Sequence, residues 1–460
     1  MSDKLKPYPK YKDSGIPWLG KIPDHWNVRR NGRLFAQRNE TGFGELPILE
    51  VSLRTGVRVR DMDNLKRKQV MSDAEKYKRA AKGDIAYNMM RMWQGALGTA
   101  PVDGLVSPAY VVARPFEETN PNYYSYLFRT EAYKAEVDGY SRGIVKDRNR
   151  LYWQDFKRMP SCFPPPEEQA AIVRFLDANA VLVRQFVRNR RRLIEVLTEQ
   201  KQAIINRAVT RGLDRNVKMK PSGVDWLGDV PKHWEVRRCK YLFREIDQRS
   251  ESGTETHLSM SQRFGLIPSD EADRKHLRSE SYAGGKLCEP NDLVLNRLKA
   301  HLGVFAKSNQ SGVISPDYTV LRPNDPEDTS YYERLFKTPP CIVELRRSTK
   351  GIVEGFWRLY TDDFYNISVP VPSKTDRQQI LTWLSSATHE LDTAIDVAFR
   401  EIEYIREYSN RKIADVACGL CNVQEIDLND STFQVDELAD VDDDLIGEED
   451  FDEEVVHADD

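Results

Sequence analysis

The chain has 460 residues, of which 40% are hydrophobic and 30% are charged, and its formal net charge is −4. A chain of this length is expected to fold as about two to four domains. The amino terminus is polar, and no apolar run approaches the roughly 18 residues of a membrane span, so the sequence predicts a soluble, cytoplasmic protein with neither a signal peptide nor a membrane partner.

The net charge conceals a basic body and an acidic end. Residues 413–460 contain 18 Asp and Glu but no Lys or Arg, which leaves 68 basic against 54 acidic residues, a net charge of +14, in residues 1–412. A basic body favours a polyanionic partner, with an ordinary solvated surface as the alternative. The acidic end, residues 416–460, has few aromatic residues, and we expect a disordered tail there.

The first predicted domain, residues 1–160, opens with a segment that the chain repeats. Residues 10–35 match residues 218–243 at a constant offset of 208, with 15 identities in 26 positions. The same offset aligns KGDIAYN (82–88) with PNDLVLN (290–296), and GLVSPAYVVARP (104–115) with GVISPDYTVLRP (312–323). The chain is therefore a tandem duplication. Short alternating apolar runs between Gly, Pro and Asn predict a mainly β domain with some helix in each copy.

A central helix is predicted within residues 161–212. Pro166 stands at its start with Glu167 and Glu168 in the first turn, and Gly212 is the next glycine or proline along the chain. These are helix start and stop signals. About 40 helical residues span roughly 60 Å, enough to separate two domains.

The second copy predicts a second domain, residues 213–370, and a C-terminal helix, residues 371–415. Ser373 and Asp376 form a start that resembles a capping box. Apolar residues then recur with the 4-3-4-3 spacing of a coiled coil, at Leu391, Ile395, Ala398, Ile402 and Ile405. Their offset partners in the central helix are Val183, Val187, Arg190, Ile194 and Leu197. The predicted fold class is α+β: two tandem mainly-β or mixed domains separated by two long helices, which pair as an antiparallel coiled coil with internal pseudo-twofold symmetry.

Several residues of the repeated opening are expected to serve the fold. Domains that read different ligands should agree where they fold and differ where they bind, so the four matched tryptophans are predicted core residues rather than base-stacking ones: Trp18, Trp26, Trp226 and Trp234. His25 and His233 have no carboxylate or cysteine beside them in sequence and are predicted to be packed or capping residues. The six cysteines do not form a disulfide framework, and Cys418 and Cys421, the one C-x-x-C, are predicted to be partly buried thiols rather than metal ligands.

These features together resemble the specificity (S) subunit of type I restriction-modification systems. The resemblance covers residues 10 to about 415 and rests on the W-L-G-x-(I/V)-P-x-H-W opening of each half, the P-P-P-E-E-Q-A-A-I start of the central helix, and the repeated order of domain and helix. The second helix departs from the pattern, because it begins VPSKTDRQQI and has Arg377 where the first has Gln169. This departure weakens the expectation that both helix ends dock identically.

The resemblance implies two target recognition domains, each reading one half of a bipartite sequence in double-stranded DNA, with the helices as spacer and docking platform. It implies a DNA methylation complex with two modification (M) subunits, which methylate adenine, and with ATP-dependent restriction (R) subunits. The chain itself is implied to be non-catalytic and to hold no cofactor, since S-adenosylmethionine, ATP and Mg are expected on the partner subunits.

Two other functions stay open. Asn120-Pro121-Asn122-Tyr123 is one residue from the N-P-P-aromatic loop of adenine methyltransferases, which would suit a self-contained DNA adenine methyltransferase. However, no glycine-rich partner motif or phosphate loop occurs, and Pro121 is better explained as a helix start. The second alternative is a helical protein-interaction scaffold whose domains do not read DNA. We therefore predict neither catalytic nor metal-binding residues.

Side chains that read DNA are expected where the two copies diverge, because base contacts should differ between half-sites. One diverged block is RTGVRVRDMDNLKRK (54–68), and another is KDRNRLYW (146–153) against EGFWRLYT (354–361). The predicted DNA-binding residues of the first domain are Arg54, Arg58, Arg60, Lys66, Arg91, Lys146, Arg148 and Arg150. Those of the second domain are Arg263, Lys275, Arg278, Arg297, Lys299 and Arg358.

Overall fold

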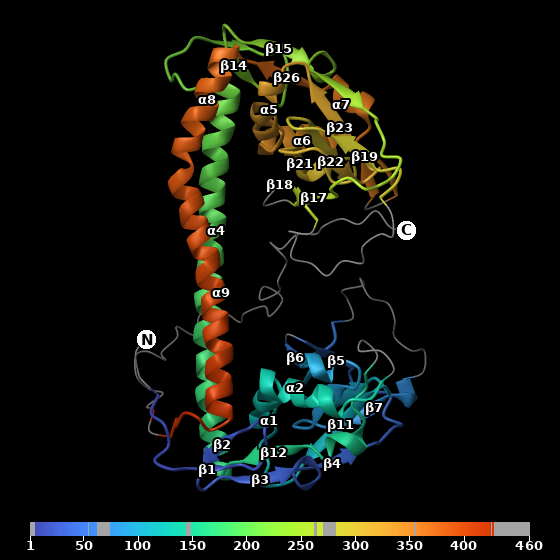
Figure 1. Cartoon of the computed structure of the whole chain (residues 1–460), viewed down its shortest axis with the longest axis vertical. Helices are drawn as coiled ribbons and strands as arrows, with labels where there is room; N and C mark the ends of the chain where they lie inside the picture. Colours follow the sequence, from blue (N-terminus) through green and yellow to red (C-terminus); the bar gives the residue numbers. More distant parts are fainter. Residues whose placement is uncertain are drawn as a thin grey trace. The chain divides into compact units, whose positions relative to one another are not determined.

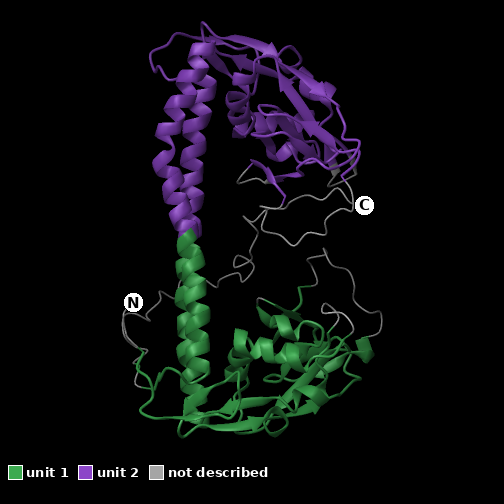
Figure 2. Ribbon diagram, viewed as in Figure 1, with its two compact units in different colours: residues 1–189, 400–446 green, residues 190–399, 447–460 purple. Residues whose placement is uncertain are grey.

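The computed structural model describes residues 5–53, 55–61, 74–143, 149–261, 265–269, 282–353, 356–424 and 426. The chain forms two compact units, which Figure 2 distinguishes by colour. Unit 1 comprises residues 1–189 and 400–446, and unit 2 comprises residues 190–399 and 447–460. Each unit contains one of the repeated domains together with a part of each long helix, whereas the sequence analysis assigned each helix to a segment of its own.

Unit 1 is built around a four-stranded antiparallel sheet in the order β4-β11-β8-β9. Figure 1 labels two of its strands, β4 and β11. Its strands are β1 (Tyr11–Asp13), β2 (Lys21–Pro23), β3 (Asn27–Arg30), β4 (Phe35–Arg38), β5 (Leu49–Ser52), β6 (Gly56–Val59), β7 (Lys78–Ala80), β8 (Ile85–Asn88), β9 (Leu97–Thr99), β10 (Gly104–Val106), β11 (Tyr110–Pro115) and β12 (Pro160–Phe163). Its short helices are α1 (Pro121–Phe128), α2 (Glu131–Tyr140) and α3 (Trp153–Phe156).

Alternate residues of this sheet serve two different cores. Ile85 and Tyr87 of β8 point to the main core, which also contains the aromatic side chains of α1. Ala86 lies in a smaller cluster with Leu49 and Val57, the buried residues of the β5–β6 hairpin. The sheet thus holds a helical layer on one face and a hairpin on the other.

Unit 2 repeats this arrangement around the sheet β16-β23-β20-β21. Its strands are β13 (Met219–Pro221), β14 (Asp229–Pro231), β15 (Glu235–Arg238), β16 (Phe243–Ile246), β17 (Leu258–Ser261), β18 (Gly265–Pro268), β19 (Lys286–Cys288), β20 (Leu293–Asn296), β21 (Phe305–Lys307), β22 (Gly312–Ile314), β23 (Tyr318–Pro323), β24 (Lys350–Val353), β25 (Phe356–Arg358) and β26 (Ser368–Val371). Its short helices are α5 (Thr329–Phe336), α6 (Pro339–Ser348) and α7 (Thr361–Asn366). Leu293 of β20 packs in the main core and Val294 packs under the hairpin β17–β18, as in unit 1.

The long helices are α4 (Pro166–Arg211) and α9 (His389–Ala417), and α8 (Lys374–Ala387) precedes α9. At 46 residues, α4 is about 69 Å long. The C-terminal stretch, which the sequence predicted as one helix, is divided at Thr388, whose hydroxyl donates to Asp392 at 3.2 Å. No described helix combines the length and apolar character needed to cross a membrane.

Both units contain side-by-side portions of α4 and α9. In unit 1, Asn179 lies 3.4 Å from Ser409 and 3.2 Å from Lys412, and in unit 2 Lys201 forms an ion pair with Asp392. The predicted seam positions Val187, Ile194, Ala398 and Ile402 are buried. Four of the ten positions of the predicted seam are thus buried, as a heptad seam requires.

Each domain contacts the end of a long helix through a tryptophan and a tyrosine that occupy equivalent positions in the two copies. Trp26 and Trp234 are 0% and 1% exposed, while Trp18 and Trp226 pack at the edges of the same cores, so the prediction that all four serve the core is confirmed. The buried Tyr123 hydroxyl donates to the Ala417 carbonyl at 2.8 Å in unit 1, and Tyr331 donates to Val209 at 2.6 Å in unit 2. These bonds satisfy carbonyls that a helix end leaves without intrahelical partners.

The first turns of the helices dock at the same positions with different chemistry. In unit 1, the buried Gln169 amide donates to the Pro164 carbonyl at 2.9 Å and accepts the Asn120 backbone N–H at 2.8 Å. In unit 2, Arg377 donates to the Pro372 carbonyl at 2.6 Å and pairs with Asp328 at 2.7 Å. The departure noted in the sequence is therefore a replacement of a neutral contact by an ion pair.

Both repeated histidines contact an acidic residue of a helix start, although none adjoins them in sequence. His25 Nε2 lies 2.8 Å from Glu168, which also accepts the Tyr8 hydroxyl, and His233 Nε2 lies 3.1 Å from Asp376. The sequence analysis missed these carboxylates because they lie a whole domain away along the chain. The two histidines thus join a domain to the start of a helix, as expected for packed histidines.

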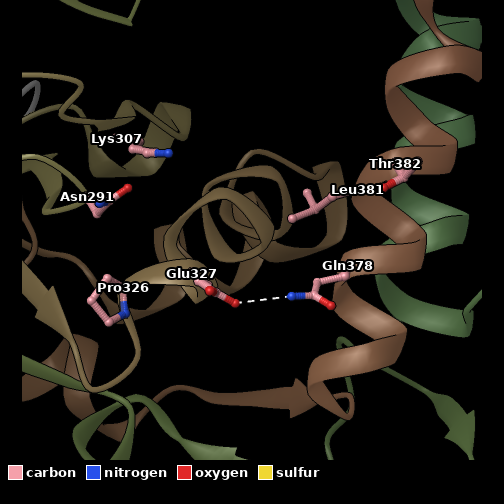
Figure 3. Close-up of a pocket in the computed structure, with 7 residues that line it drawn as sticks. All are labelled: Asn291, Lys307, Pro326, Glu327, Gln378, Leu381 and Thr382. Atoms are coloured by element: carbon pink, nitrogen blue, oxygen red, sulfur yellow. Dashed lines mark hydrogen bonds between the residues drawn. The ribbon is translucent and has the colours of Figure 1, made fainter.

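Figure 3 shows a pocket of about 390 Å³ beside the helix start in unit 2, lined by Asn291, Lys307, Pro326, Glu327, Gln378, Leu381 and Thr382. Gln378 donates to Glu327 at 3.1 Å, and Lys307 donates to Ser330 at 3.2 Å. Three of its polar side chains, Gln378, Glu327 and Lys307, thus already have partners within unit 2. Among the described residues, no group of three or more His, Cys, Asp or Glu could hold a metal ion, in this pocket or elsewhere.

Candidate nucleic-acid interface

A tight turn follows strand β8 in unit 1 and strand β20 in unit 2, and each turn carries a basic residue that was predicted to bind DNA. Asn88 ends β8 and its Oδ1 accepts the Met90 backbone N–H at 3.0 Å, while Asn296 ends β20 and accepts the Leu298 N–H at 3.1 Å. Such a bond from Asn to the backbone two residues on stabilises a turn. Arg91 and Lys299 occupy the fourth position of these equivalent turns.

A short antiparallel arm lies beside each turn. In unit 1 it consists of the bridge between Arg142 and Arg150, and in unit 2 Lys350 of β24 pairs with Arg358 of β25. The Leu151 N–H donates to the Met89 carbonyl of the turn at 2.9 Å, and the Leu359 N–H donates to the Arg297 carbonyl at 3.0 Å. These bonds hold the turn that carries Arg91 against the arm that carries Arg150, and the turn that carries Arg297 and Lys299 against the arm that carries Arg358.

The arm places two cations opposite each other in both units, and like charges in this position destabilise paired strands. In unit 1, Arg142 is neutralised by Asp155 at 2.6 Å. In unit 2, Lys350 lies 2.8 Å from Asp363 at the matched position, and Arg358 also pairs with an acidic residue, Asp317. Arg150 remains exposed at the surface. An arm with this charge arrangement suits an anionic ligand such as a phosphate group.

In unit 2 the turn and the arm share an additional acidic residue. Arg297 Nε donates to the Asp317 backbone carbonyl at 2.7 Å, and Arg358 lies 3.1 Å from the Asp317 carboxylate. Two of the predicted DNA-binding arginines are therefore held in place by one loop residue, which restricts the positions of their guanidinium groups.

The β5–β6 hairpin of unit 1 presents charged residues on its outer face. Glu50 and Arg58 are direct cross-strand partners, and Arg58 Nε donates to Glu50 at 2.6 Å. Both side chains are partly exposed. Burial raises the pKa of the nearby Tyr110 hydroxyl, while Arg91 lowers that pKa and Glu50 raises it. Tyr110 packs against the buried residues of the hairpin and is the cross-strand partner of Asn88, the first residue of the turn, so the hairpin and the turn meet around it.

The equivalent hairpin β17–β18 of unit 2 presents neutral polar groups. Ser259 Oγ lies 2.5 Å from Ser269 Oγ, which lies 2.5 Å from His257 Nδ1. The His257 ring stacks on Tyr282 with 3.8 Å between centroids and an angle of 11° between planes. The sequence analysis did not single out this network, because it selected only lysine and arginine residues as DNA-binding candidates.

The remaining predicted cations can be placed as follows. Arg60 directly follows β6, where its N–H donates to the Ile48 carbonyl at 2.8 Å. Seven predicted DNA-binding residues lie outside the described residues: Arg54, Lys66, Lys146, Arg148, Arg263, Lys275 and Arg278. Arg142 and Lys350 were not predicted, although the constant offset of 208 aligns them and could have identified both.

The segment that raised the methyltransferase alternative is structural. Asn120 caps α1 by accepting the backbone N–H groups of Asn122 and Tyr123, and Pro121 is the first helical residue, so the predicted helix start is confirmed. Tyr123 is buried with its hydroxyl near Cys162 as well as the end of α9. These side chains are engaged in a helix cap and a core rather than facing a ligand.

Comparison with known proteins identifies the fold. No family model and no curated protein matches the chain. Among solved structures, a chain from a study of complex assembly and conformational transition in a type I R-M system matches with a TM-score of 0.58 and 15% identity, covering 86% of this chain and 98% of that one. The protein shares the fold of that chain.

Two further solved chains are similar to this protein at lower TM-scores. The HsdS subunit from Thermoanaerobacter tengcongensis has a TM-score of 0.40 and 17% identity over 87% of this chain and 97% of that one. The type I restriction-modification S subunit from M. genitalium has a TM-score of 0.33 and 13% identity over 85% and 96%. The resemblance stated from the sequence is confirmed at the level of the fold by the first of these chains, the one from a type I R-M system.

Proposed function

We propose that the protein is the DNA sequence-recognition subunit of a type I restriction-modification complex and that its two domains read the two halves of a bipartite target. The observation that carries this proposal is the duplicated turn and arm, which present cations at matched positions in both units. Binding to the phosphate backbone requires such cations and does not depend on sequence. The shared fold with a type I R-M chain supports the same assignment.

In this proposal α4 pairs with α8 and α9 as an antiparallel coiled coil that acts as the spacer between the two recognition domains. The contacts between α4 and α9 within each unit support the pairing. The outer faces of these helices then serve as docking sites for two modification subunits and for restriction subunits.

The subunit itself is proposed to be non-catalytic and cytoplasmic. The structural roles of Asn120 and Tyr123 support the absence of a methyltransferase site in that segment. S-adenosylmethionine, ATP and Mg then belong to the partner subunits, and this chain contributes the choice of DNA sequence.

A base-resolution map of modified adenine tests the proposal. Genomic DNA is compared from cells that express the chain with its modification subunit and from cells that express the modification subunit alone. A new split motif, two short half-sites around a fixed gap, is the expected result. A chain with both Arg150→Ala and Arg358→Ala tests the arm. It should give less modification of this same motif than the wild-type chain. If no new modification occurs with a folded, assembled complex, the recognition role is wrong and the scaffold alternative is favoured.

A further inference from the structure

The elements of the candidate nucleic-acid interface differ in whether their charge is the same in both units. The turn carries Arg91 or Lys299, and the arm carries Arg150 or Arg358, so each of these positions is cationic in both units. The hairpins, in contrast, keep their backbone but change their side chains. This difference is informative because the two units share one fold and therefore one set of folding requirements.

The hairpin backbones are equivalent by geometry as well as by sequence. The Arg60 N–H donates to the Ile48 carbonyl at 2.8 Å, and the Ser269 N–H donates to the His257 carbonyl at 2.9 Å. Gly56 and Gly265 begin the second strand of each hairpin at φ values of 80° and 74°, which favour glycine. Residues of β5–β6 therefore correspond to residues of β17–β18 at an offset of 209.

The outer faces of these equivalent hairpins differ in chemistry. The cross-strand pair is Glu50 with Arg58 in unit 1 and Ser259 with Ile267 in unit 2. The next position is Arg60 in unit 1 and Ser269 in unit 2. An ion pair and a second arginine are thus replaced by hydroxyl groups and an aliphatic side chain.

We infer that the turn and arm hold phosphate groups in both units, while the outer faces of the hairpins read the bases. The inference rests on the proposed function, and it follows from the different demands of the two kinds of contact. Phosphate contacts position a protein on DNA and are the same for every sequence, whereas base contacts must differ if the half-sites differ.

The hairpin chemistry indicates which bases each unit reads. The Arg58 guanidinium can donate two hydrogen bonds to O6 and N7 of guanine, and the Glu50 carboxylate can accept one from N4 of cytosine. The β5–β6 hairpin therefore suits a G·C pair. In unit 2, serine hydroxyls accept and donate without strong preference and Ile267 suits the methyl group of thymine, so β17–β18 does not require guanine.

The test measures base preference and salt dependence separately. The full chain, assembled with its modification subunit, is incubated with a library of randomised DNA, and the bound sequences are read. Arg58→Ala should abolish a guanine preference at one position of one half-site and leave the other half-site unchanged. Arg58→Lys keeps the charge but lacks the planar fork, so it should weaken the same preference without changing the dependence of affinity on salt.

A reciprocal transplant provides a gain-of-function arm. Ser259→Glu combined with Ile267→Arg places the unit 1 pair on the unit 2 hairpin and should create a G·C preference in the second half-site. By contrast, Arg91→Ala and its matched variant Lys299→Ala should weaken binding to all sequences alike. Each should reduce the slope of log affinity against log salt concentration by about 1.

The outcomes separate this inference from the proposed function. If the wild-type complex selects a split motif but Arg58→Ala only lowers affinity uniformly, the division is wrong and the proposed function stands. The same holds if Arg91→Ala or Lys299→Ala changes base preference. If the wild-type complex selects no motif, both are overturned. Thermal unfolding of each variant verifies that loss of binding does not reflect loss of folding.

Discussion

The two junctions between domain and helix use the same positions but not the same bonds. In unit 1, a neutral amide, Gln169, meets the backbone of Asn120, whereas in unit 2 Arg377 meets the carboxylate of Asp328. Both members of the contact have changed together between the copies. The comparison teaches that the position of the contact is required by the fold, while its chemistry is free to change when its two partners change as a pair.

The largest expected effect comes from the tryptophan that both junctions share. Trp26→Ala and Trp234→Ala should each destabilise their unit by about 3–5 kcal/mol, because both side chains are fully buried. Trp→Phe should destabilise unit 2 more than unit 1. Trp234 Nε1 donates to Asp376 at 3.1 Å, whereas Trp26 Nε1 has no hydrogen-bond partner within the described part of the chain. Chemical denaturation measures both pairs, and equal losses from the two Trp→Phe changes would contradict this difference.

Breaking the ion pair of unit 2 should have the next largest effect. Arg377 and Asp328 are only 12% and 13% exposed, so Arg377→Gln should cost about 3 kcal/mol by leaving a carboxylate without its cation. Adding Asp328→Asn recreates the pairing of unit 1 and should recover most of that loss. Urea unfolding of the two single variants and the double variant gives the coupling energy, and additive losses would show that the two residues do not act as a pair.

The same variant should depend on pH in a defined direction. Burial raises the pKa of the Asp328 carboxyl and Arg377 lowers it, so removing the arginine raises that pKa further. An acid whose pKa is raised on folding favours the folded state at low pH, and this contribution is lost as pH rises. Arg377→Gln should therefore be less destabilising near pH 5 than near pH 8, relative to wild type at the same pH.

A smaller effect is expected where a glycine packs against each junction tryptophan. Gly419 and Gly212 follow the ends of α9 and α4 with φ values of 79° and 74°, so alanine is strained at both. A Cβ at Gly419 would lie 2.7 Å from the Trp26 ring, against 3.3 Å from the Trp234 ring for Gly212. Gly419→Ala should cost about 2–3 kcal/mol and Gly212→Ala about 1 kcal/mol. Thermal unfolding ranks them, and the reverse order would contradict the packing difference.

The smallest effect should come from the histidines. His233 is 55% exposed and its partner Asp376 is partly exposed, so His233→Gln should change stability by less than about 1 kcal/mol. His25→Gln should cost more, because its partner Glu168 is 2% exposed and depends on buried hydrogen bonds. Denaturation midpoints of the two variants measure the difference, and identical shifts would mean that burial of the acid is unimportant.

The duplication explains why much of this fold could be predicted. Constant spacing identified the two domains, the core tryptophans, and the helices, since a pattern repeated at one offset reports shared folding requirements. Contacts between distant residues could not be predicted in this way: His25 gives no local sign of Glu168, and Met89 gives none of Leu151. The serine and histidine side chains of β17–β18 were missed for another reason, because the prediction selected only lysine and arginine residues.

The tyrosine bonds that secure the helix ends have a consequence for synthesis of the chain. Tyr331 bonds to Val209, which precedes it by 122 residues, whereas Tyr123 bonds to Ala417, which follows it by 294 residues. During synthesis, Tyr331 is therefore made after Val209, its partner in α4. The first domain, in contrast, cannot form the bond from Tyr123 until almost the entire chain has been made. During that interval Trp26 lacks the helix end that packs against it, so the nascent first domain keeps part of its apolar core uncovered until synthesis is almost complete.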